Sequence, residues 1–263
     1  MSKNSINLFD FVQFPNIDRR ELLRSHYEVF TKLIQIKTNI LEKYKEKEVP
    51  FDFIDYGTSV ITWIIEYNHE LFAISIPLYQ MFDTYHRLIL ISSDHNIDQC
   101  QCLQILINYY SEIIAYYIDS AFEKSIYIFN SMFRLKINQG KGSLQKIVKE
   151  ISRNSKNNRF IEMTNKELSG IKANNIYQGL KEMRNLNTHS IRATQQGFLD
   201  IYNEKTGITE SKITTNKDSK ETVEVIIGAV TLLCNYTEFI NNLLEEYYDS
   251  IYDDHVRLGW ITE

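Results

Sequence analysis

Apolar residues recur every three or four positions along most of this chain, a spacing typical of amphipathic α-helices. The longest such run ends at Gly140-Lys141-Gly142, and Pro77 lies inside another run, where a break or kink is expected. Thr164, followed three residues later by Glu167, has the spacing of a capping box. The pattern predicts helices over 18–48, 58–91 (one helix or two), 101–137, 143–155, from 164, over 173–183, and from Ser219 or Glu221 to about 249.

The stretch over 198–215 lacks this helical spacing. Short apolar runs flank Lys205-Thr206-Gly207, which predicts a short β-hairpin or an ordered loop. Only 9 glycines and 3 prolines occur in 263 residues, too few for the many tight turns of an all-β protein. We therefore predict an all-α helical bundle over 99–263, preceded by an N-terminal helical region over 1–98, or one continuous domain.

Composition narrows the environment and the partners. The net charge is −5 at pH 7, so nucleic-acid binding requires a local basic patch. The N-terminus has no cationic start followed by an apolar run, and the three cysteines are an odd number, so we expect a cytoplasmic protein. The stretch Val60–Tyr79 is broken by Glu66, His69 and Glu70, so we expect no contact with a membrane.

One segment has a strong local excess of positive charge. Between Arg134 and Arg159, eight lysines and arginines occur with a single acidic residue, Glu150. Such charge is what binds phosphate backbones, so the segment predicts an RNA-binding surface, although a solvated helix face has the same composition. The candidate RNA-binding residues are Lys141, Lys146, Lys149, Arg153, Lys156 and Arg159.

Few residues have the spacing of a metal or cofactor site. Cys100-x-Cys102 with His95 is a sparse ligand set, and structural thiols are the favoured interpretation. Gly140-Lys141-Gly142-Ser143 lacks the frame of a phosphate-binding loop. We therefore expect neither a metal nor a cofactor.

The candidate catalytic residues lie in the stretch Arg184-Asn185-Leu186-Asn187-Thr188-His189. Arginine carries a permanent, forked cation that suits a phosphate, and histidine exchanges a proton near neutral pH. Together these two side chains suffice to cleave RNA, whose own 2′-hydroxyl is the nucleophile. The alternative interpretation is a surface arginine on a last helical turn and a histidine that caps it.

An arginine, a polar residue and then a histidine after four to six intervening residues resembles the motif of the HEPN superfamily. Arg184, Asn185 and His189 match the form with four spacers. The resemblance implies a helical bundle and a metal-independent endoribonuclease of the kind found in toxin–antitoxin and antiviral (phage) defence systems. It also implies a homodimer in which two motifs build one site.

The same resemblance raises the question of an antitoxin partner. Many toxin members carry a tyrosine two residues after the histidine, where an antitoxin modifies them, whereas this chain has Ile191. Control by that route is therefore not expected. The alternatives to a nuclease are a non-catalytic scaffold that binds RNA or protein, and a nucleotide-binding sensor.

Helix geometry adds a constraint on the motif. Five residues along an α-helix correspond to a rotation of about 500°, so positions 184 and 189 differ by about 140° around one straight helix. Asn187-Thr188 has the residue types of a break or cap. We therefore expect a break there that brings His189 back toward Arg184.

Overall fold

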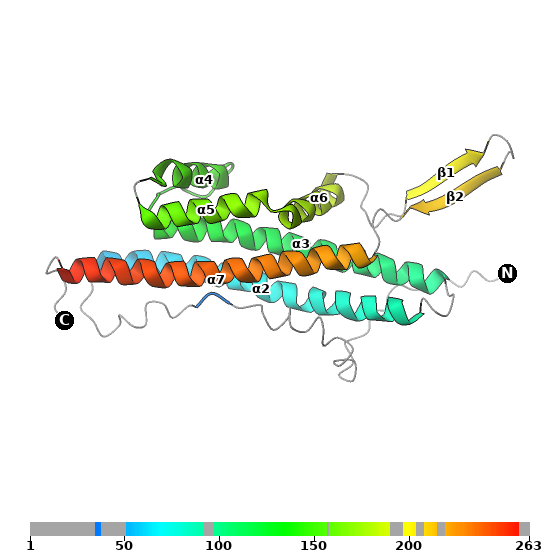
Figure 1. Cartoon of the computed structure of the whole chain (residues 1–263), viewed down its shortest axis with the longest axis horizontal. Helices are drawn as coiled ribbons and strands as arrows, with labels where there is room; N and C mark the ends of the chain where they lie inside the picture. The colour runs from blue at the N-terminus through cyan, green and yellow to red at the C-terminus, as the bar shows by residue number, and fades with distance from the viewer. Residues whose placement is uncertain are drawn as a thin grey trace. The chain divides into compact units, whose positions relative to one another are not determined.

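A computed structural model describes residues 35–37, 51–91, 97–156, 158–189, 197–203, 208–214 and 219–257. Within these ranges, the side chains of residues 51–56, 97–98, 184–189, 255–257 and both strands lie outside the description. The described elements are α2 (Phe51–Ile91), α3 (Ile97–Met132), α4 (Ser143–Asn154), α5 (Arg159–Ala173), α6 (Asn175–His189), β1 (Gly197–Asn203), β2 (Ile208–Thr214) and α7 (Ser219–Arg257) (Figure 1). The predicted all-α bundle with one hairpin is confirmed.

The chain divides into two compact units, and the long helices contribute residues to both. Of the described residues, those within 74–116 and 179–228 form unit 1, and those within 31–73, 117–178 and 229–263 form unit 2. The boundary predicted at residue 98 stays a prediction.

Unit 1 is packed by apolar side chains from four helices. The helical spacing of these residues places them on one side of each helix, which is why the segments fold as amphipathic helices. The buried apolar residues are Ile74, Leu78, Met81, Phe82 and Leu88 of α2, Leu103, Leu106, Ile107, Tyr110, Ile114 and Ala115 of α3, Leu180 and Met183 of α6, and Val223 and Ile226 of α7.

Unit 2 has a core in which large rings carry paired hydroxyl groups. The Tyr67 hydroxyl lies 2.8 Å from Thr237 Oγ1, and the Tyr236 hydroxyl lies 2.8 Å from Ser125 Oγ. Burial raises the pKa of both tyrosines, and their hydrogen-bond partners oppose the shift only in part. Both phenols therefore stay neutral, and each buried hydroxyl is satisfied without a charge in the core.

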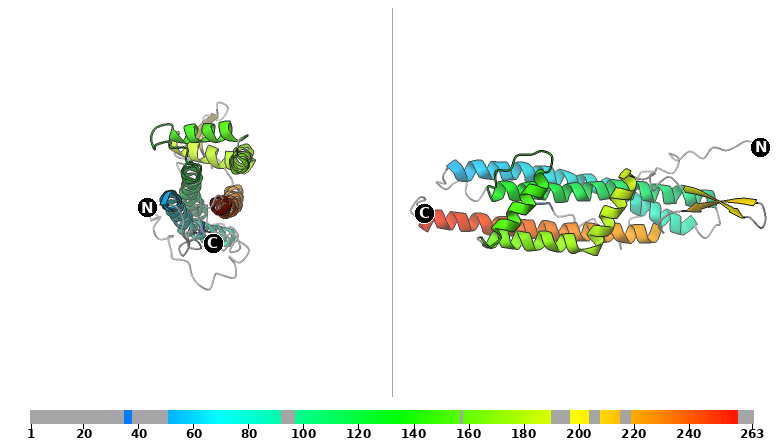
Figure 2. Two further views of the ribbon diagram at one scale, coloured as in Figure 1. Left: turned by 90° about the vertical axis from the view of Figure 1, so that its left-hand side faces the viewer. Right: turned by 90° about the horizontal axis from the view of Figure 1, so that it is seen from above.

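Helices α4 and α5 pack against each other in unit 2, and α4 runs at a steep angle to α5 (Figure 2). Ile147 and Ile151 of α4 are fully buried. Ser143, at the start of α4, is bonded to the Tyr127 hydroxyl of α3 at 2.7 Å. The tyrosine bond and the two isoleucines fix which side of α4 meets the protein.

The start of α5 differs from the prediction. Helix α5 begins at Arg159, and the side chain of Asn158 caps it by accepting hydrogen bonds from Phe160 N at 2.8 Å and Ile161 N at 3.2 Å. Thr164 is buried inside the helix and donates to Phe160 O at 2.9 Å. The capping-box prediction at Thr164 was wrong because asparagine, an equally good N-cap, precedes it.

Two of the long helices also differ in extent from their predictions. Helix α2 begins at Phe51, seven residues before its predicted start at residue 58, and it is one helix that contains Pro77, which is one of the two predicted alternatives. Helix α3 ends at Met132, five residues before its predicted end at residue 137. In the turn that follows, Asn130 Nδ2 donates to Ile137 O at 3.0 Å and Asn130 Oδ1 accepts from Ile137 N at 3.2 Å. This side chain therefore replaces helical hydrogen bonds after α3.

The predicted hairpin is present. Strands β1 and β2 pair in antiparallel register from Gly197 opposite Thr214 to Asn203 opposite Ile208. Seven-residue strands on either side of the Lys205-Thr206-Gly207 stretch match the prediction for 198–215 closely.

The predicted N-terminal helix over 18–48 is contradicted at residues 35–37, the part of it that the structure describes. Residues 35–37 are non-helical, and Ile36 is buried. Their backbone groups bond to asparagine side chains of α2 and α7 instead of to a helical turn. The rest of the predicted helix lies outside the described residues.

Helix α7 is apolar enough to match a membrane span by length and composition alone. An 18-residue window between Ser219 and Asp254 has a mean hydropathy of 1.5, and half of that window is buried. It is the one such helix in the part of the chain that the structure describes. A core helix has the same composition, and residues such as Leu233 and Ile240 of α7 are fully buried.

Candidate functional site

The backbone of helix α6 carries all three candidate catalytic residues. Helix α6 runs from Asn175 to His189 and thus includes Arg184, Asn185 and His189. The side chains of these three residues lie outside the described part of the structure. Their convergence on one cleft therefore stays a prediction.

The start of α6 is fixed by a cap and by contacts to α3 in unit 2. Asn174 Oδ1 accepts from Ile176 N at 2.9 Å and from Tyr177 N at 3.4 Å. The Tyr177 hydroxyl donates to Asp119 at 3.3 Å, and its ring meets Phe122 edge-on with centroids 5.0 Å apart. These contacts hold the first turn of α6 against α3 in unit 2.

The expected break at Asn187-Thr188 is not observed. The helix continues through both residues and ends at His189. N-cap residue types favour a helix start or a turn, but a local preference of this kind does not by itself end a helix. Because the helix is continuous, positions 184 and 189 differ by about 140° around its axis.

The candidate RNA-binding residues form an exposed basic surface on α4, the loops on either side of it and the first residue of α5. Lys146, Lys149 and Arg153 are exposed, whereas Ile147 and Ile151 between them are buried. This alternation places the cations on the solvent side of α4. We call Lys141, Lys146, Lys149, Arg153, Lys156 and Arg159, all of which are exposed, the basic surface.

Two cations of the basic surface have acidic neighbours. Arg159 pairs with Glu246 of α7 at 3.0 Å, and Arg153 lies 3.9 Å from Glu150. Among the described residues, no ion pair is found for Lys141, Lys146, Lys149 or Lys156. The surface therefore keeps most of its positive charge available to a polyanion.

The loop before α4 has an unusual backbone with basic side chains. Arg134 and Lys136 adopt left-handed conformations, with φ of 54° and 56°. Non-glycine residues rarely adopt this region, so the surrounding contacts must hold it. The paired hydrogen bonds of Asn130 to Ile137 provide such a constraint on the same turn.

A polar cluster in unit 1 was not found from the sequence. Asp83 and Arg87 of α2 lie 3.9 Å apart with side chains 4% and 13% exposed. Burial lowers the pKa of His86, while the charge of Asp83 opposes that shift. Burial likewise raises the pKa of Tyr110, with Arg87 opposing. The only signal for this cluster was the i, i+4 spacing of Asp83 and Arg87, which most surface helices share.

The thiols do not form a metal site in the part of the chain that the structure describes. Cys100 and Cys102 are half-buried and Cys234 is buried. No group of three His, Cys, Asp or Glu side chains that could hold a metal occurs among the described residues. His95 of the sparse ligand set lies outside them.

A comparison with known protein families identifies the family of this chain. The model of the Cthe2314-like HEPN family matches residues 63–241, more than half of the 263 residues. The chain belongs to the HEPN domain family. Searches of curated proteins and of solved structures each found no match.

The matched HEPN region contains both parts of the candidate site. It includes the motif over 184–189 and the basic surface from Lys141 to Arg159. It also begins within the region 1–98 that the sequence pattern set apart. HEPN domains often have ribonuclease activity, so the fold agrees with the function class that the motif indicates.

Proposed function

We propose that this HEPN protein is a metal-independent endoribonuclease. The observation that carries the proposal is the sequence Arg184-Asn185-x-x-x-His189 at the end of helix α6, inside the matched HEPN region. The chemistry needs an acid or base and a fixed cation, and these residues supply both.

The proposed reaction is a transfer of the phosphodiester bond within RNA. His189 removes the proton of a 2′-hydroxyl, whose oxygen attacks the adjacent phosphorus, and the bond from phosphorus to the 5′-oxygen breaks. A histidine in its acid form gives a proton to that leaving oxygen. The products are a 2′,3′-cyclic phosphate and a 5′-hydroxyl, and proton transfer of this kind accelerates reactions by about 10²–10⁴-fold.

Arg184 and Asn185 complete the proposed site. The Arg184 guanidinium donates hydrogen bonds to the two non-bridging oxygens of the phosphate as negative charge develops on them. Asn185 orients the histidine or the backbone around it. The roles of all three residues come from the motif and from general chemistry.

The continuous helix α6 favours a site built from two chains. One straight helix carries positions 184 and 189 on sides about 140° apart. A second copy, related by a two-fold axis, brings its own α6 to the same place and supplies the complementary proton role. We therefore propose a homodimer as the active form.

RNA affinity is proposed to come from the basic surface. The six exposed cations attract phosphates without regard to base sequence. We further propose that the protein acts in the cytoplasm as a toxin or phage-defence effector, with RNA as substrate and an antitoxin protein as a candidate partner.

Cleavage in the presence of a chelator tests the proposal. Purified protein incubated with structured RNA in EDTA should yield fragments with 2′,3′-cyclic phosphate ends. The His189→Ala variant should yield none, and the His69→Ala variant, which changes an exposed histidine of α2, should cleave as the wild type does. Cleavage that returns only with Mg²⁺ or Mn²⁺ would overturn the proposed mechanism.

A non-catalytic RNA-binding scaffold is the second candidate function. The observation that favours it is that the basic surface, on α4, its flanking loops and the start of α5, is apart in sequence from the motif on α6. RNA binding with a steep salt dependence, and no cleavage by wild-type protein under any condition, would support the scaffold.

A further inference from the structure

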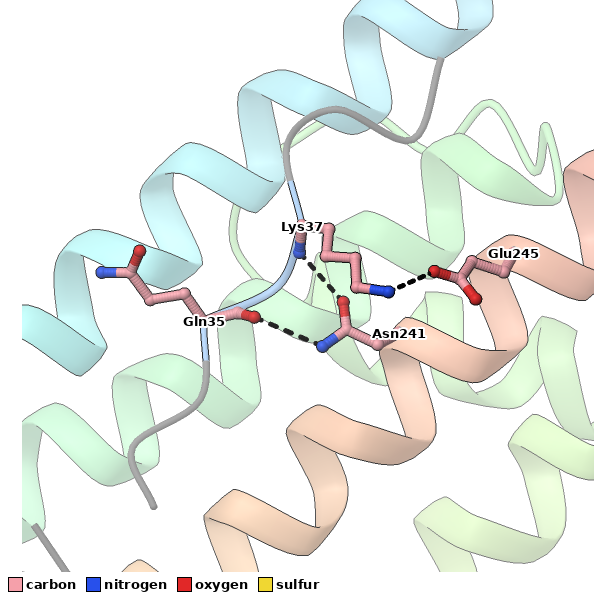
Figure 3. Close-up of polar contacts among 4 residues, drawn as sticks. All are labelled: Gln35, Lys37, Asn241 and Glu245. Atoms are coloured by element: carbon pink, nitrogen blue, oxygen red, sulfur yellow. Dashed lines mark hydrogen bonds and ion pairs between the residues drawn. The ribbon is translucent and has the colours of Figure 1, made fainter. Parts of the chain in front are cut away.

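A short extended segment of this chain is bound between two helices of unit 2. Ile36 N donates to Asn68 Oδ1 at 2.9 Å, and Asn68 Nδ2 donates to Ile36 O at 2.8 Å. Lys37 N donates to Asn241 Oδ1 at 2.9 Å, and Asn241 Nδ2 donates to Gln35 O at 3.3 Å (Figure 3). Asn68 belongs to α2 and Asn241 to α7, so both helices hold the same three residues.

These four hydrogen bonds recognise the backbone rather than the side chains of the segment. Each asparagine amide uses its oxygen on an N–H and its nitrogen on a C=O, which satisfies the main chain as a neighbouring strand would. Asn241 is largely buried, so its bonds form out of water. Any extended residue can accept this arrangement, which makes it a means of holding a peptide.

Two side-chain contacts add selectivity for the segment that is bound between α2 and α7. Ile36 is 1% exposed and fills an apolar position. The ammonium of Lys37 pairs with Glu245 of α7 at 2.6 Å, whereas the side chain of Gln35 points away from Asn241 (Figure 3). These contacts therefore favour a segment in which an apolar residue is followed directly by a lysine.

We propose that Asn68 of α2 with Asn241 and Glu245 of α7 form a binding site in unit 2 for an extended peptide with this apolar–lysine pattern, and that residues 35–37 occupy it as a built-in ligand. A tethered ligand has an effective concentration of about 1 mM, so it competes with any external peptide. The partner class is a protein segment with the same pattern, which enters when residues 35–37 leave.

A fluorescent peptide of residues 32–40 is the probe. Full-length Ile36→Asp protein, in which a charge expels the built-in ligand, should bind it at least about tenfold more tightly than the wild type. Adding Asn241→Ala should abolish that binding. Adding Asn242→Ala, which changes the exposed neighbouring asparagine of α7, should leave it unchanged. Anisotropy titration measures each affinity.

A charge swap separates peptide recognition from a purely structural role. A probe with glutamate in place of Lys37 should bind Ile36→Asp protein about two- to fivefold more weakly at low salt. Glu245→Lys in that protein should restore the affinity. A structural tether predicts no such exchange of preference.

Three results would overturn the inference. One is a folded Ile36→Asp protein, with wild-type helix content, that binds no probe. The second is an equal effect of Asn241→Ala and Asn242→Ala. If Ile36→Asp fails to fold, hydrogen exchange at the backbone N–H groups of Ile36 and Lys37 in wild-type protein decides instead: about 1 mM peptide should accelerate it, and an unchanged rate is the third.

Discussion

At position 184, we expect that positive charge alone does not support the reaction. Arg184→Lys keeps the charge but loses the fork that engages two phosphate oxygens. We expect its kcat for RNA cleavage to fall by about 10²-fold, the effect of removing a transition-state donor. The free energy of unfolding should change by less than about 1 kcal/mol. Single-turnover cleavage and chemical denaturation measure the two quantities.

The matched control for that substitution is Arg153→Lys on the exposed face of α4. It makes the same exchange within the basic surface, where charge matters more than shape. Its cleavage rate should equal that of the wild type. Equal rates for the Arg184→Lys and Arg153→Lys proteins would remove the guanidinium fork from the mechanism.

His86 should give the stability of the protein a pH dependence near neutrality. Burial holds its pKa below the ordinary value of 6.5, with Asp83 opposing. The unfolded chain then binds the proton first, so the stability present above that ordinary value is lost as the pH falls below it. His86→Gln should flatten the unfolding free energy between about pH 7.5 and about pH 5.5. His69→Gln, which keeps His86, should retain the slope.

Residue types were easier to predict from the sequence than residue geometry. The motif Arg184, Asn185, His189 could be named because its spacing is short and unusual. The continuity of α6 through Asn187-Thr188 could not be predicted, because the local residue preference there favours a break. The cluster at Asp83 was missed because a helical pattern predicts which side of α2 is buried, and not that Asp83 and Arg87 form a buried ion pair there.

The cap of α5 is a single side chain with a measurable effect on an element. Asn158 satisfies the N–H groups of Phe160 and Ile161, which otherwise have no helical partner. Asn158→Ala should lower the free energy of unfolding by about 1 kcal/mol. Asn235→Ala, an exposed position inside α7, should not lower it. Urea denaturation followed by circular dichroism compares the two, and equal effects would contradict the capping role.

The basic surface on α4 should control RNA affinity without controlling catalysis. Reversing Lys146, Lys149 and Arg153 to glutamate should weaken binding to all RNA sequences and flatten its salt dependence, since fewer counterions are released. Cleavage at saturating RNA should largely persist. Salt-titrated binding measures the slope, and an unchanged slope would remove this surface from the proposal.

A control variant with the same change in net charge tests whether the position of those cations matters for RNA affinity. Lys166, Lys172 and Lys220 are also exposed, but they lie on α5 and α7. Reversing these three lysines makes the same change in net charge. If both triple variants lose affinity equally, the net charge of the protein, rather than the surface on α4, governs RNA binding.

Whole helices were predicted better than their ends. Periodicity found the long helices and the hairpin because each depends on a repeated pattern over many residues. The start of α5 and the end of α3 each depend on one asparagine side chain that bonds to backbone groups, and the non-helical segment at Ile36 depends on two. Asn68 and Asn241 are distant from Ile36 in sequence, so no local pattern could have revealed them.

For the whole molecule, membership of the HEPN family connects the fold to the candidate site. The matched region over 63–241 starts within α2 and ends within α7. The all-α prediction came from spacing and composition, whereas the extent of the match required comparison with a family. How two copies meet depends on surfaces that a single sequence does not specify.

Mixing subunits tests whether the active site spans two chains. Wild-type and His189→Ala chains, unfolded together and refolded at equal amounts, form a statistical mixture of dimers. If each site needs a histidine from both chains, activity should fall to about one quarter of the wild-type value, because only wild-type pairs are active. If one chain suffices, it should fall to about one half. The measurement is the initial rate of RNA cleavage in EDTA across several mixing ratios. A straight line through the origin would show that each site needs only one of the two histidines, and it would overturn the complementary proton role proposed for the second copy.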